Sequence, residues 1–339
     1  MVFGNFLAVR KPYFILKVLL MKDVFCLLFM CLFSISAIAQ KQDFTIYIET
    51  TDIGNFWIAY DEVQKISSTE QKISIFQNLY VDKATVGLKD FIQSRNFTSR
   101  QWIESFESKP KFWKSIKNKT VSIQKDFKNI EKLYQNFNQL YTGFSPPKIY
   151  FTIGNLKGGG TVVNGNLIIG SELAASDKTV DYSELSKNYQ DRMKMNSGVI
   201  FLTAHELVHT QQNLKGTLTN LLGLCLKEGS ADFIAELLTG KKVEAPYIEY
   251  GMRHQNSLWN DFQKEMNGEY FQNWLSNTAT IKDRPADLGY FMGYIITKKF
   301  YERSKNKKSA VSTIINLDFS NMAETENFLE KSGYKNDMK

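Results

Sequence analysis

Cysteine, histidine and proline are scarce in this chain of 339 residues, which contains three cysteines, three histidines and six prolines. So few prolines, together with only 20 glycines, exclude a collagen-like or wholly disordered chain. Hydrophobic residues make up 43% of the sequence, which is ample for a packed core. The length fits one large domain or two smaller ones.

Long apolar runs are absent except near the N-terminus. Two charged residues after Met21 are followed by the apolar stretch VFCLLFMCLFSISA and then by the small-x-small sequence AIA at 37–39. This is the pattern of a signal peptide, and the apolar stretch is short for a membrane-spanning helix. We therefore expect residues 1–39 to be a cleaved leader, with Met21 as a possible true start, and the mature chain to be exported to the periplasm or the medium. The bulky Met30 before Cys31 argues against a lipoprotein anchor.

Removal of the leader changes the counts that bear on function. Two of the three cysteines are lost, and the one that stays, Cys225, cannot form an internal disulfide. The formal net charge falls from +7 to +4, since the leader carries four basic residues and one acid. This charge is too small and too evenly spread to indicate a nucleic-acid partner. The lysine-rich segments 109–119 and 305–308 are expected to be solvated surface.

The chain divides into a helical part and a part that contains strands. Residues 43–50 alternate as a strand does, and residues 55–142 carry apolar residues at helical spacing. After Pro146 and Pro147, segments 148–154 and 161–170 predict strands, and the Asn164-Gly165 pair predicts a hairpin turn. Residues 198–213, 218–239 and 287–302 predict helices, the second ended by Gly240. The predicted fold class is α+β and mainly helical, with a helical N-terminal region at 40–145 and a catalytic domain at 146–339.

The sequence His-Glu-Leu-Val-His at 205–209 carries the chemistry. A spacing of four places His205 and His209 on one face of a helix, one turn apart, where both imidazoles can bind a single zinc ion. Glu206 is rotated by about 100° from that face, which suits a base acting on metal-bound water. The metzincin arrangement is excluded, because Gln212 and Lys215 stand where it needs glycine and histidine.

A third ligand is expected on the next helix. Glu228 follows His209 after 18 intervening residues, enough for a turn and an antiparallel helix, and its apolar surroundings suggest burial. Asp232 lies one turn further on and is expected to accept a hydrogen bond from a ligand histidine, His205 in particular. Asp232 and Glu236 are alternative ligands.

These segments resemble the bacterial family of zinc-dependent proteases that is itself inferred from its HExxH motif and belongs to the gluzincin group. The resemblance covers roughly residues 75–302 and rests on GLKDFI (87–92), PPKIYFTIG (146–154), GGGTVVNGNLIIGSE (158–172), TAHELVHTQQ (203–212), KEGSADFIAEL (227–237) and LGYFMGYIITKKFY (288–301). It implies a zincin-like fold with a small sheet and an active-site helix, with His205, His209 and Glu228 as zinc ligands and Glu206 as base.

The expected function is that of an exported zinc metallohydrolase, a peptidase acting on a peptide or protein substrate. Zinc would activate water, Glu206 would take its proton, and Tyr290 would stabilise the oxyanion, with Tyr294 and His254 as alternatives. The strand NLIIG at 166–170, if it edges the cleft, could bind an extended peptide. One alternative is an amide hydrolase acting on cell-wall peptides. Another is a non-catalytic exported binding or assembly protein with a vestigial metal site.

Overall fold

The computed structural model describes Met1 and residues 47–194, 198–212, 214–278 and 280–337, so the expected signal peptide lies outside the described residues. Residues 44–339 form one compact unit. This unit is mainly helical with a small four-stranded sheet, which confirms the predicted α+β class. Among the described residues, no helix combines the length and the apolar character needed to span a membrane.

The first part of the unit is a set of short helices, as the periodicity of residues 55–142 predicts. A capping box between Thr98 and Gln101 begins one of them, and Asn96 in the left-handed conformation ends the one before it. The elements are α2 (Thr51–Val63), α3 (Thr69–Phe76), the π-helical η2 (Gln77–Val81), α4 (Val86–Arg95), α5 (Ser99–Ser108), α6 (Pro110–Val121), the 3₁₀ segment η3 (Ser122–Asp126) and α7 (Phe127–Leu140).

A four-stranded mixed sheet follows, in the order β1-β2-β4-β3. Its strands are β1 (Ile48–Glu49), β2 (Ile149–Thr152), β3 (Gly160–Val163) and β4 (Asn166–Gly170). β3 and β4 form the predicted hairpin, and both Asn164 and Gly165 at its turn have positive φ, as the tightest hairpin turns require. The backbone of 166–170 is not free to bind an extended peptide, contrary to the expectation for a strand at the edge of the cleft, because β4 pairs with β2 and β3 on its two sides. The edge strand on that side is β3.

The second part of the unit is again helical. Asn220 caps the start of its longest helix by accepting from the amide of Gly223, and Gly240 ends that helix with φ of 69°. The elements are α8 (Ser171–Ala174), α9 (Lys187–Lys194), α10 (Gly198–His209), α11 (Leu221–Thr239), α12 (Pro246–Arg253), α13 (Gln255–Glu265), α14 (Leu288–Arg303), α15 (Lys307–Ile315), α16 (Met322–Ser332) and α17 (Tyr334–Asp337).

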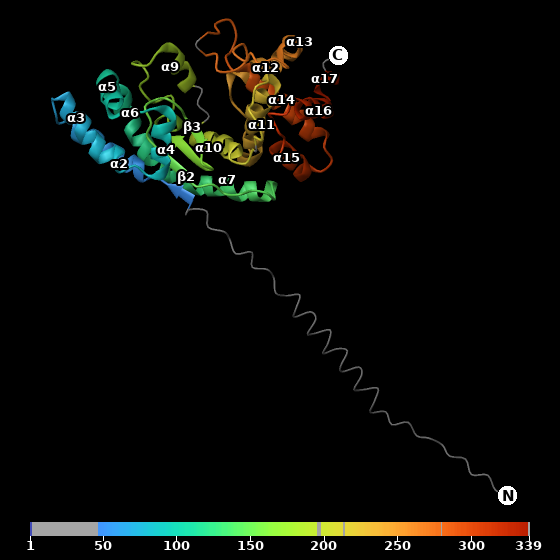
Figure 1. Cartoon of the computed structure of the whole chain (residues 1–339), viewed down its shortest axis with the longest axis horizontal. Coiled ribbons are helices and arrows are strands. Elements are labelled where there is room, and N and C mark those ends of the chain that lie inside the picture. The colour runs from blue at the N-terminus through green and yellow to red at the C-terminus, as the bar shows by residue number, and fades with distance from the viewer. Residues whose placement is uncertain (2–46, 195–197, 213, 279, 338–339) are drawn as a thin grey trace. The chain divides into compact units, whose positions relative to one another are not determined.

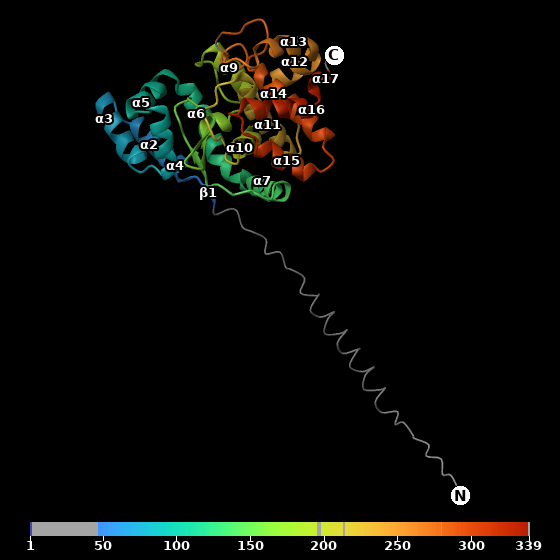
Figure 2. The ribbon, with the colours of Figure 1, turned by 45° about the vertical axis from the view of Figure 1, so that its right-hand side comes forward.

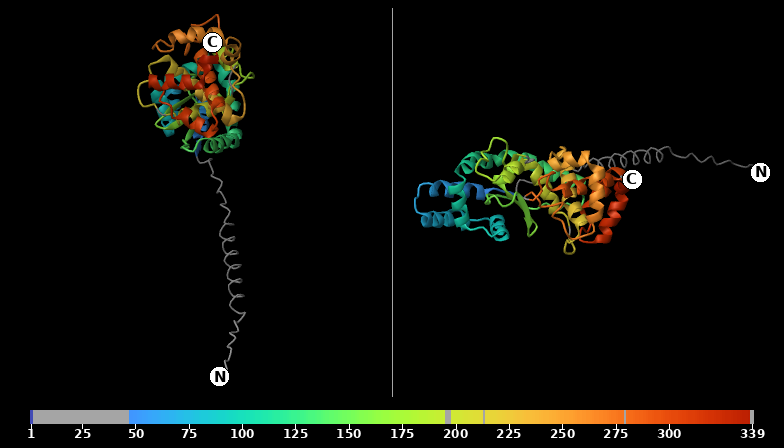
Figure 3. Two further views of the ribbon diagram at one scale, coloured as in Figure 1. Left: turned by 90° about the vertical axis from the view of Figure 1, so that its right-hand side faces the viewer. Right: turned by 90° about the horizontal axis from the view of Figure 1, so that it is seen from above.

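The sheet lies between the two helical parts. Figure 1 shows α2 to α6 on one side of the strands and α11 to α17 on the other, and the view from above in Figure 3 shows the same order. Buried aromatic side chains fix the first helical part to the end of β2. The Tyr80 hydroxyl donates to the carbonyl of Ile153 at 2.6 Å, and the Trp102 indole donates to the carbonyl of Gly154 at 2.7 Å. Each ring thus buries apolar area without leaving its polar atom unpaired.

Close contact between α11 and α14 sets the geometry of the second part (Figure 2). Glycines allow the two backbones to approach. A Cβ built on Gly293 would lie 1.7 Å from the carbonyl oxygen of Cys225, and one on Gly229 would lie 2.0 Å from the backbone nitrogen of Tyr294. No side chain fits at either position. The crossing therefore holds α11, which carries Glu228, in a fixed place relative to α14, which carries Tyr290.

Candidate metal centre

His205 and His209 lie one turn apart on α10 and direct their Nε2 atoms to the same point. The two Nε2 atoms are 3.0 Å apart, and the rings are nearly perpendicular. Each of the two side chains is only 10% exposed. The helical spacing alone accounts for this arrangement, because residues four apart share a face.

Glu228 reaches the same point from α11. Its Oε2 atom lies 3.2 Å from Nε2 of His209 and 3.6 Å from Nε2 of His205. The other carboxylate oxygen, Oε1, accepts a hydrogen bond from Lys227 at 2.7 Å. One oxygen of Glu228 is therefore held by a lysine, and the other faces the two histidines.

Asp232 orients His205. The Nδ1 of His205 donates to Oδ1 of Asp232 at 2.8 Å, as the spacing of one helical turn after Glu228 leads one to expect. The second oxygen of Asp232 accepts from the hydroxyl of Tyr247 at 2.8 Å. Tyr247, at the start of α12, is absent from the residues expected at the site. Its sequence position offers no signal, since it lies 15 residues after Asp232 across a turn.

Gln212 orients His209 in the same way. Its Nε2 donates to the carbonyl of Lys227 and to the hydroxyl of Ser230, each at 3.0 Å, so its oxygen must face the histidine. That oxygen lies 2.7 Å from Nδ1 of His209, which is therefore the protonated nitrogen of the neutral ring. In the sequence, Gln212 serves only as evidence against a metzincin. Its position three residues after His209, nearly one helical turn, nevertheless suits a hydrogen bond to that histidine.

The hydrogen-bond partners leave three acceptors facing one another. With Nδ1 of each neutral histidine donating outward, both Nε2 atoms present lone pairs, and Oε2 of Glu228 is a carboxylate oxygen. Three converging acceptors without a donor are unfavourable unless a proton or a metal ion lies between them. A tetrahedral zinc ion with bonds of about 2.0–2.1 Å separates its ligand atoms by about 3.3 Å. The observed separations of 3.0, 3.2 and 3.6 Å bracket that value, so this nitrogen and oxygen donor set fits zinc.

The electrostatics of the cluster favour a positive charge at this point. Burial lowers the pKa of His205, but hydrogen bonds to Asp232 and Glu228 outweigh burial and raise it to about 10. Burial raises the pKa of Glu228, but the charge of His209 and hydrogen bonds from both histidines bring it well below its usual value. A proton and a metal ion can both meet this demand, so they compete for the site.

Glu206 lies beside the cluster without joining it. Its side chain rests against the edge strand β3, where a Cβ on Gly160 would lie 2.5 Å from Cγ of Glu206. Only a glycine at this position leaves room for the carboxylate. No hydrogen bond or ion pair of that carboxylate is found among residues 47–194, 198–212, 214–278 and 280–337. The structure thus places Glu206 near the three ligand atoms with its oxygens available.

The three residues considered as oxyanion donors lie in different surroundings. The ring of Tyr290 stacks on His205 with centroids 6.2 Å apart, so Tyr290 lies at the site. Tyr294 is turned away, because its hydroxyl donates to Glu236 at 2.8 Å and accepts from Lys298. This contact also occupies Glu236, one of the alternative ligands. His254 is exposed at the end of α12 and bonds the carbonyl of Tyr250, so it is not part of the site.

Comparison with known proteins gives one family. The model of the family described as "Gliding motility protein GldB", a lipoprotein family, matches residues 36–336. No curated protein and no solved structure matches the chain. The match spans both helical parts and the sheet, whereas the protease resemblance rests on short segments.

The match corrects several expectations. Membership of the gluzincin-type zinc-dependent proteases is wrong, and so are the peptidase and hydrolase functions that depended on it, because the family is one of gliding motility. Two of the segments that carried the resemblance contain His205, His209 and Glu228, a third forms the hairpin, and the others lie in α4, β2 and α14. Two histidines one turn apart and a glutamate on the next helix can bind a metal in any protein, whether or not that protein is a hydrolase. These residues therefore do not by themselves identify a protease.

The same match bears on location. The family is one of exported lipoproteins, which agrees with the expected export and contradicts the argument against a lipid anchor. That argument relied on a single residue, Met30, before Cys31. The family model covers well over half of the chain. The chain belongs to the family of the gliding motility protein GldB.

Proposed function

We propose that this chain is a lipid-anchored component of a gliding-motility apparatus that acts by binding and assembly and not by hydrolysis. We also propose that His205, His209 and Glu228 hold a zinc ion that joins α10 to α11. The family match over residues 36–336 supports the first part. The three mutually facing acceptor atoms carry the second part.

A bound zinc ion would neutralise the three acceptors and act as a cross-link between two helices. The protein supplies an unusually complete support for it. Asp232 and Gln212 each fix the ring of one histidine, and Tyr247 fixes Asp232 in turn. Such supporting hydrogen bonds hold the ligands in place and raise their basicity. These three supporting side chains suit a metal site whose role is to stabilise the fold.

Glu206 and Tyr290 have no catalytic part in this proposal. Glu206 keeps its carboxylate beside the ligand atoms, and three protein ligands leave a fourth position of a tetrahedral ion open. A side chain of a partner protein can occupy that position, with Glu206 as a hydrogen-bond acceptor next to it. The site would then be a point of assembly.

The lipid anchor is proposed at Cys31. Cys225 is buried within α11, and burial raises the pKa of its thiol, so it is not available for modification. The other two cysteines, Cys26 and Cys31, belong to the expected leader. Cys31 follows the longer part of the apolar stretch, which is where the signal of an exported lipoprotein places its cysteine.

A zincin-like arrangement is also proposed for the second half of the unit. Its support is the mixed sheet next to α10 and the placement of the three ligands on two successive helices. An experimental structure of the protein with zinc would test this arrangement. A different order of the ligand helices around the sheet would refute it.

Substitution of Glu206 separates assembly from hydrolysis. The chain is expressed in a gliding bacterium that lacks its own GldB protein, and colony spreading is measured. We expect Glu206→Gln to restore spreading as well as the wild type, because no proton transfer is needed. His209→Ala should fail to restore it, because the cross-link is lost. Loss of spreading in Glu206→Gln, with zinc content and protein level unchanged, would contradict the proposal and indicate a catalytic role.

A further inference from the structure

The helices α6 and α7, with η3 between them, carry a row of exposed lysines on their outer side. The buried residues of this run recur every three or four positions from Phe112 to Phe137, so one face is packed throughout. Lysines recur with the same spacing on the opposite face. We name this row the lysine stripe, and it consists of Lys111, Lys114, Lys125, Lys128 and Lys132.

The ammonium groups of the lysine stripe are not neutralised within the described part of the chain. None of the five forms an ion pair or a side-chain hydrogen bond there, whereas the flanking Lys117 and Lys119 pair with Asp61 and Asp177. Acidic groups close to the stripe are few. Asp126 and Glu131 are half-buried on the same run, and the carboxylate of Glu184 accepts hydrogen bonds from the backbone amides of Lys111 and Phe112. Hydrogen bonds from Ser183 and, after them, the charge of Lys111 lower the pKa of Asp181.

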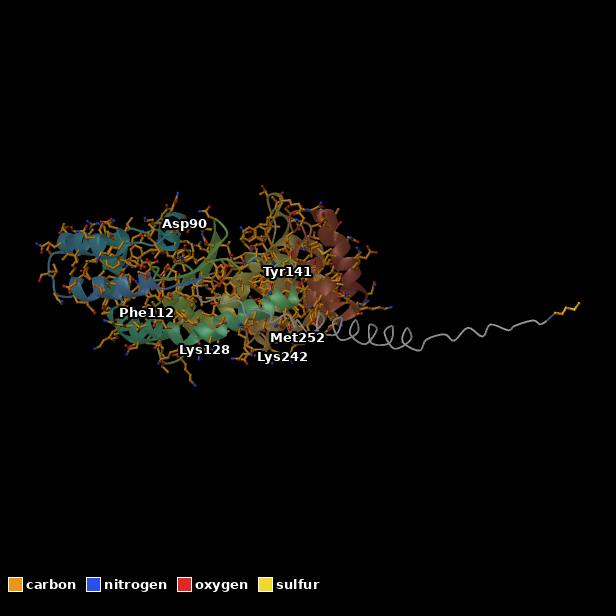
Figure 4. All side chains as sticks on the ribbon, turned by 90° about the horizontal axis from the view of Figure 1, so that it is seen from below. Asp90, Phe112, Lys128, Tyr141, Lys242 and Met252 are labelled. Carbon is orange, nitrogen blue, oxygen red and sulfur yellow. The ribbon has the colours of Figure 1, made fainter. Side chains whose placement is uncertain are left out.

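The shape of the stripe suits a flat surface. From Lys111 to Lys132 the run extends over about 30 Å at the rise of a helix. Figure 4 shows α6 and α7 following one another along one side of the molecule, past Phe112, Lys128 and Tyr141. Val121, in the middle of the row, is 52% exposed and adds an apolar contact. Lys241 and Lys242 extend the basic surface, since Leu238 before them accepts a hydrogen bond from Asn136 of α7.

The chain enters the compact unit against the packed face of α7, a helix that carries part of the lysine stripe on its opposite face. The ring of Tyr47 stacks on Tyr134 of α7, with centroids 6.1 Å apart. Only 15 residues lie between Cys31 and Tyr47, so the two residues are at most about 55 Å apart when the chain is fully extended. A chain anchored at Cys31 therefore holds the start of the compact unit within about 55 Å of the membrane. Lysines near an anionic bilayer are attracted to it at short range.

We propose that the lysine stripe binds the surface of an anionic phospholipid bilayer and so orients the anchored protein with α6 and α7 against the membrane. The argument for the bilayer as occupant rests on the lipid anchor of the proposed function. The charge of the stripe, its lack of ion pairs within the described part of the chain and its location on α6 and α7 do not depend on that anchor. The binding is electrostatic, and it adds to whatever the acyl chains contribute.

Vesicle co-sedimentation tests this surface directly. Residues 44–339, a compact unit with its own core, are mixed with vesicles of phosphatidylcholine alone or with added phosphatidylglycerol. We expect binding only to the anionic vesicles, with loss of binding at high salt. The variant Lys114→Gln/Lys125→Gln/Lys128→Gln should bind about a hundredfold more weakly, at about fivefold per lysine.

A matched variant controls for net charge. Lys305→Gln/Lys308→Gln/Lys331→Gln removes the same charge from exposed positions on and around α15 and α16 and should bind as the wild type does. Equal binding to neutral and anionic vesicles, or equal loss in both variants, would overturn the proposal. Labelling of the full chain with a fatty acid, compared with Cys31→Ala, tests the anchor separately. The two experiments are independent, so either the proposal for the lysine stripe or the proposal for the lipid anchor can be refuted without the other.

Discussion

The donor and acceptor roles of single side chains decide what the central cluster can be. Asp232 and Gln212 accept the Nδ1 hydrogens of His205 and His209, so in the neutral rings both Nε2 atoms turn lone pairs inward. The motif predicts that His205 and His209 converge, because their spacing places them on one face of a helix. It misses Tyr247 and assigns no role to Gln212, since those contacts depend on how α10, α11 and α12 pack.

Another buried carboxyl gives a test at the residue scale. Burial raises the pKa of Glu172 from 4.5 to about 7, although the amides of Gly154 and Leu156 donate to it. The folded state therefore holds a proton more tightly than the unfolded state. Between these values stability falls as pH rises, and above about pH 7 this loss is complete. The loss amounts to about 3 kcal/mol.

Urea unfolding of the wild type and of Glu172→Gln at several pH values measures this pH-dependent contribution of Glu172 to stability. The amide can still accept one of the two backbone hydrogens but does not titrate. We expect the difference in unfolding free energy between the two proteins to shift by about 3 kcal/mol in favour of the variant from about pH 5 to about pH 8. Parallel pH profiles would show that Glu172 stays ionised in the fold.

At the scale of elements, the crossing of α11 and α14 holds the site together. Glu228 and Asp232 lie on one of these helices and Tyr290 on the other, and Gly229 and Gly293 allow their backbones to touch. Such a close approach excludes any side chain at either glycine. The position of the third ligand therefore depends on residues that bear no functional group.

The substitution Gly293→Ala tests the crossing. Its Cβ would overlap the carbonyl oxygen of Cys225, so the helices must separate. We expect the free energy of unfolding to fall by about 3 kcal/mol, as for severe overpacking. Gly54→Ala in α2 is the control, because nothing lies within 4 Å of its Cβ, and it should raise stability by about 0.5–1 kcal/mol. Equal small effects in both variants would contradict the tight crossing.

Local patterns account for what the sequence predicts correctly. The hairpin at Asn164-Gly165, the end of α11 at Gly240 and the helices around His205 and Glu228 all follow from neighbouring residues. The order of the strands does not, because β2 pairs with β4 across the hairpin, and this pairing makes β4 an inner strand. The family cannot be identified from short segments either, because unrelated proteins share motifs such as HExxH. The match over residues 36–336 identifies the family.

At the scale of the whole molecule, three features are proposed to act together. A lipid at Cys31 would keep the protein at a membrane, the lysine stripe would orient it there, and the zinc cross-link between α10 and α11 would stabilise the second helical part. In this proposal, the lipid and the lysine stripe determine the location and orientation of the compact unit, and the zinc cross-link contributes to its stability. The zinc cross-link is the central claim, because the proposed role of His205, His209 and Glu228 depends on it.

Zinc content combined with thermal unfolding tests this claim most directly. The purified protein should carry one zinc ion per chain, and removal of the ion by a chelator should lower the unfolding temperature by about 10 °C, as expected for a tightly bound ion. Readdition of zinc should restore it, and His209→Ala should contain no zinc and show no response to the chelator. A wild-type protein that contains no zinc, and whose unfolding temperature changes with neither chelator nor added zinc, would contradict the account.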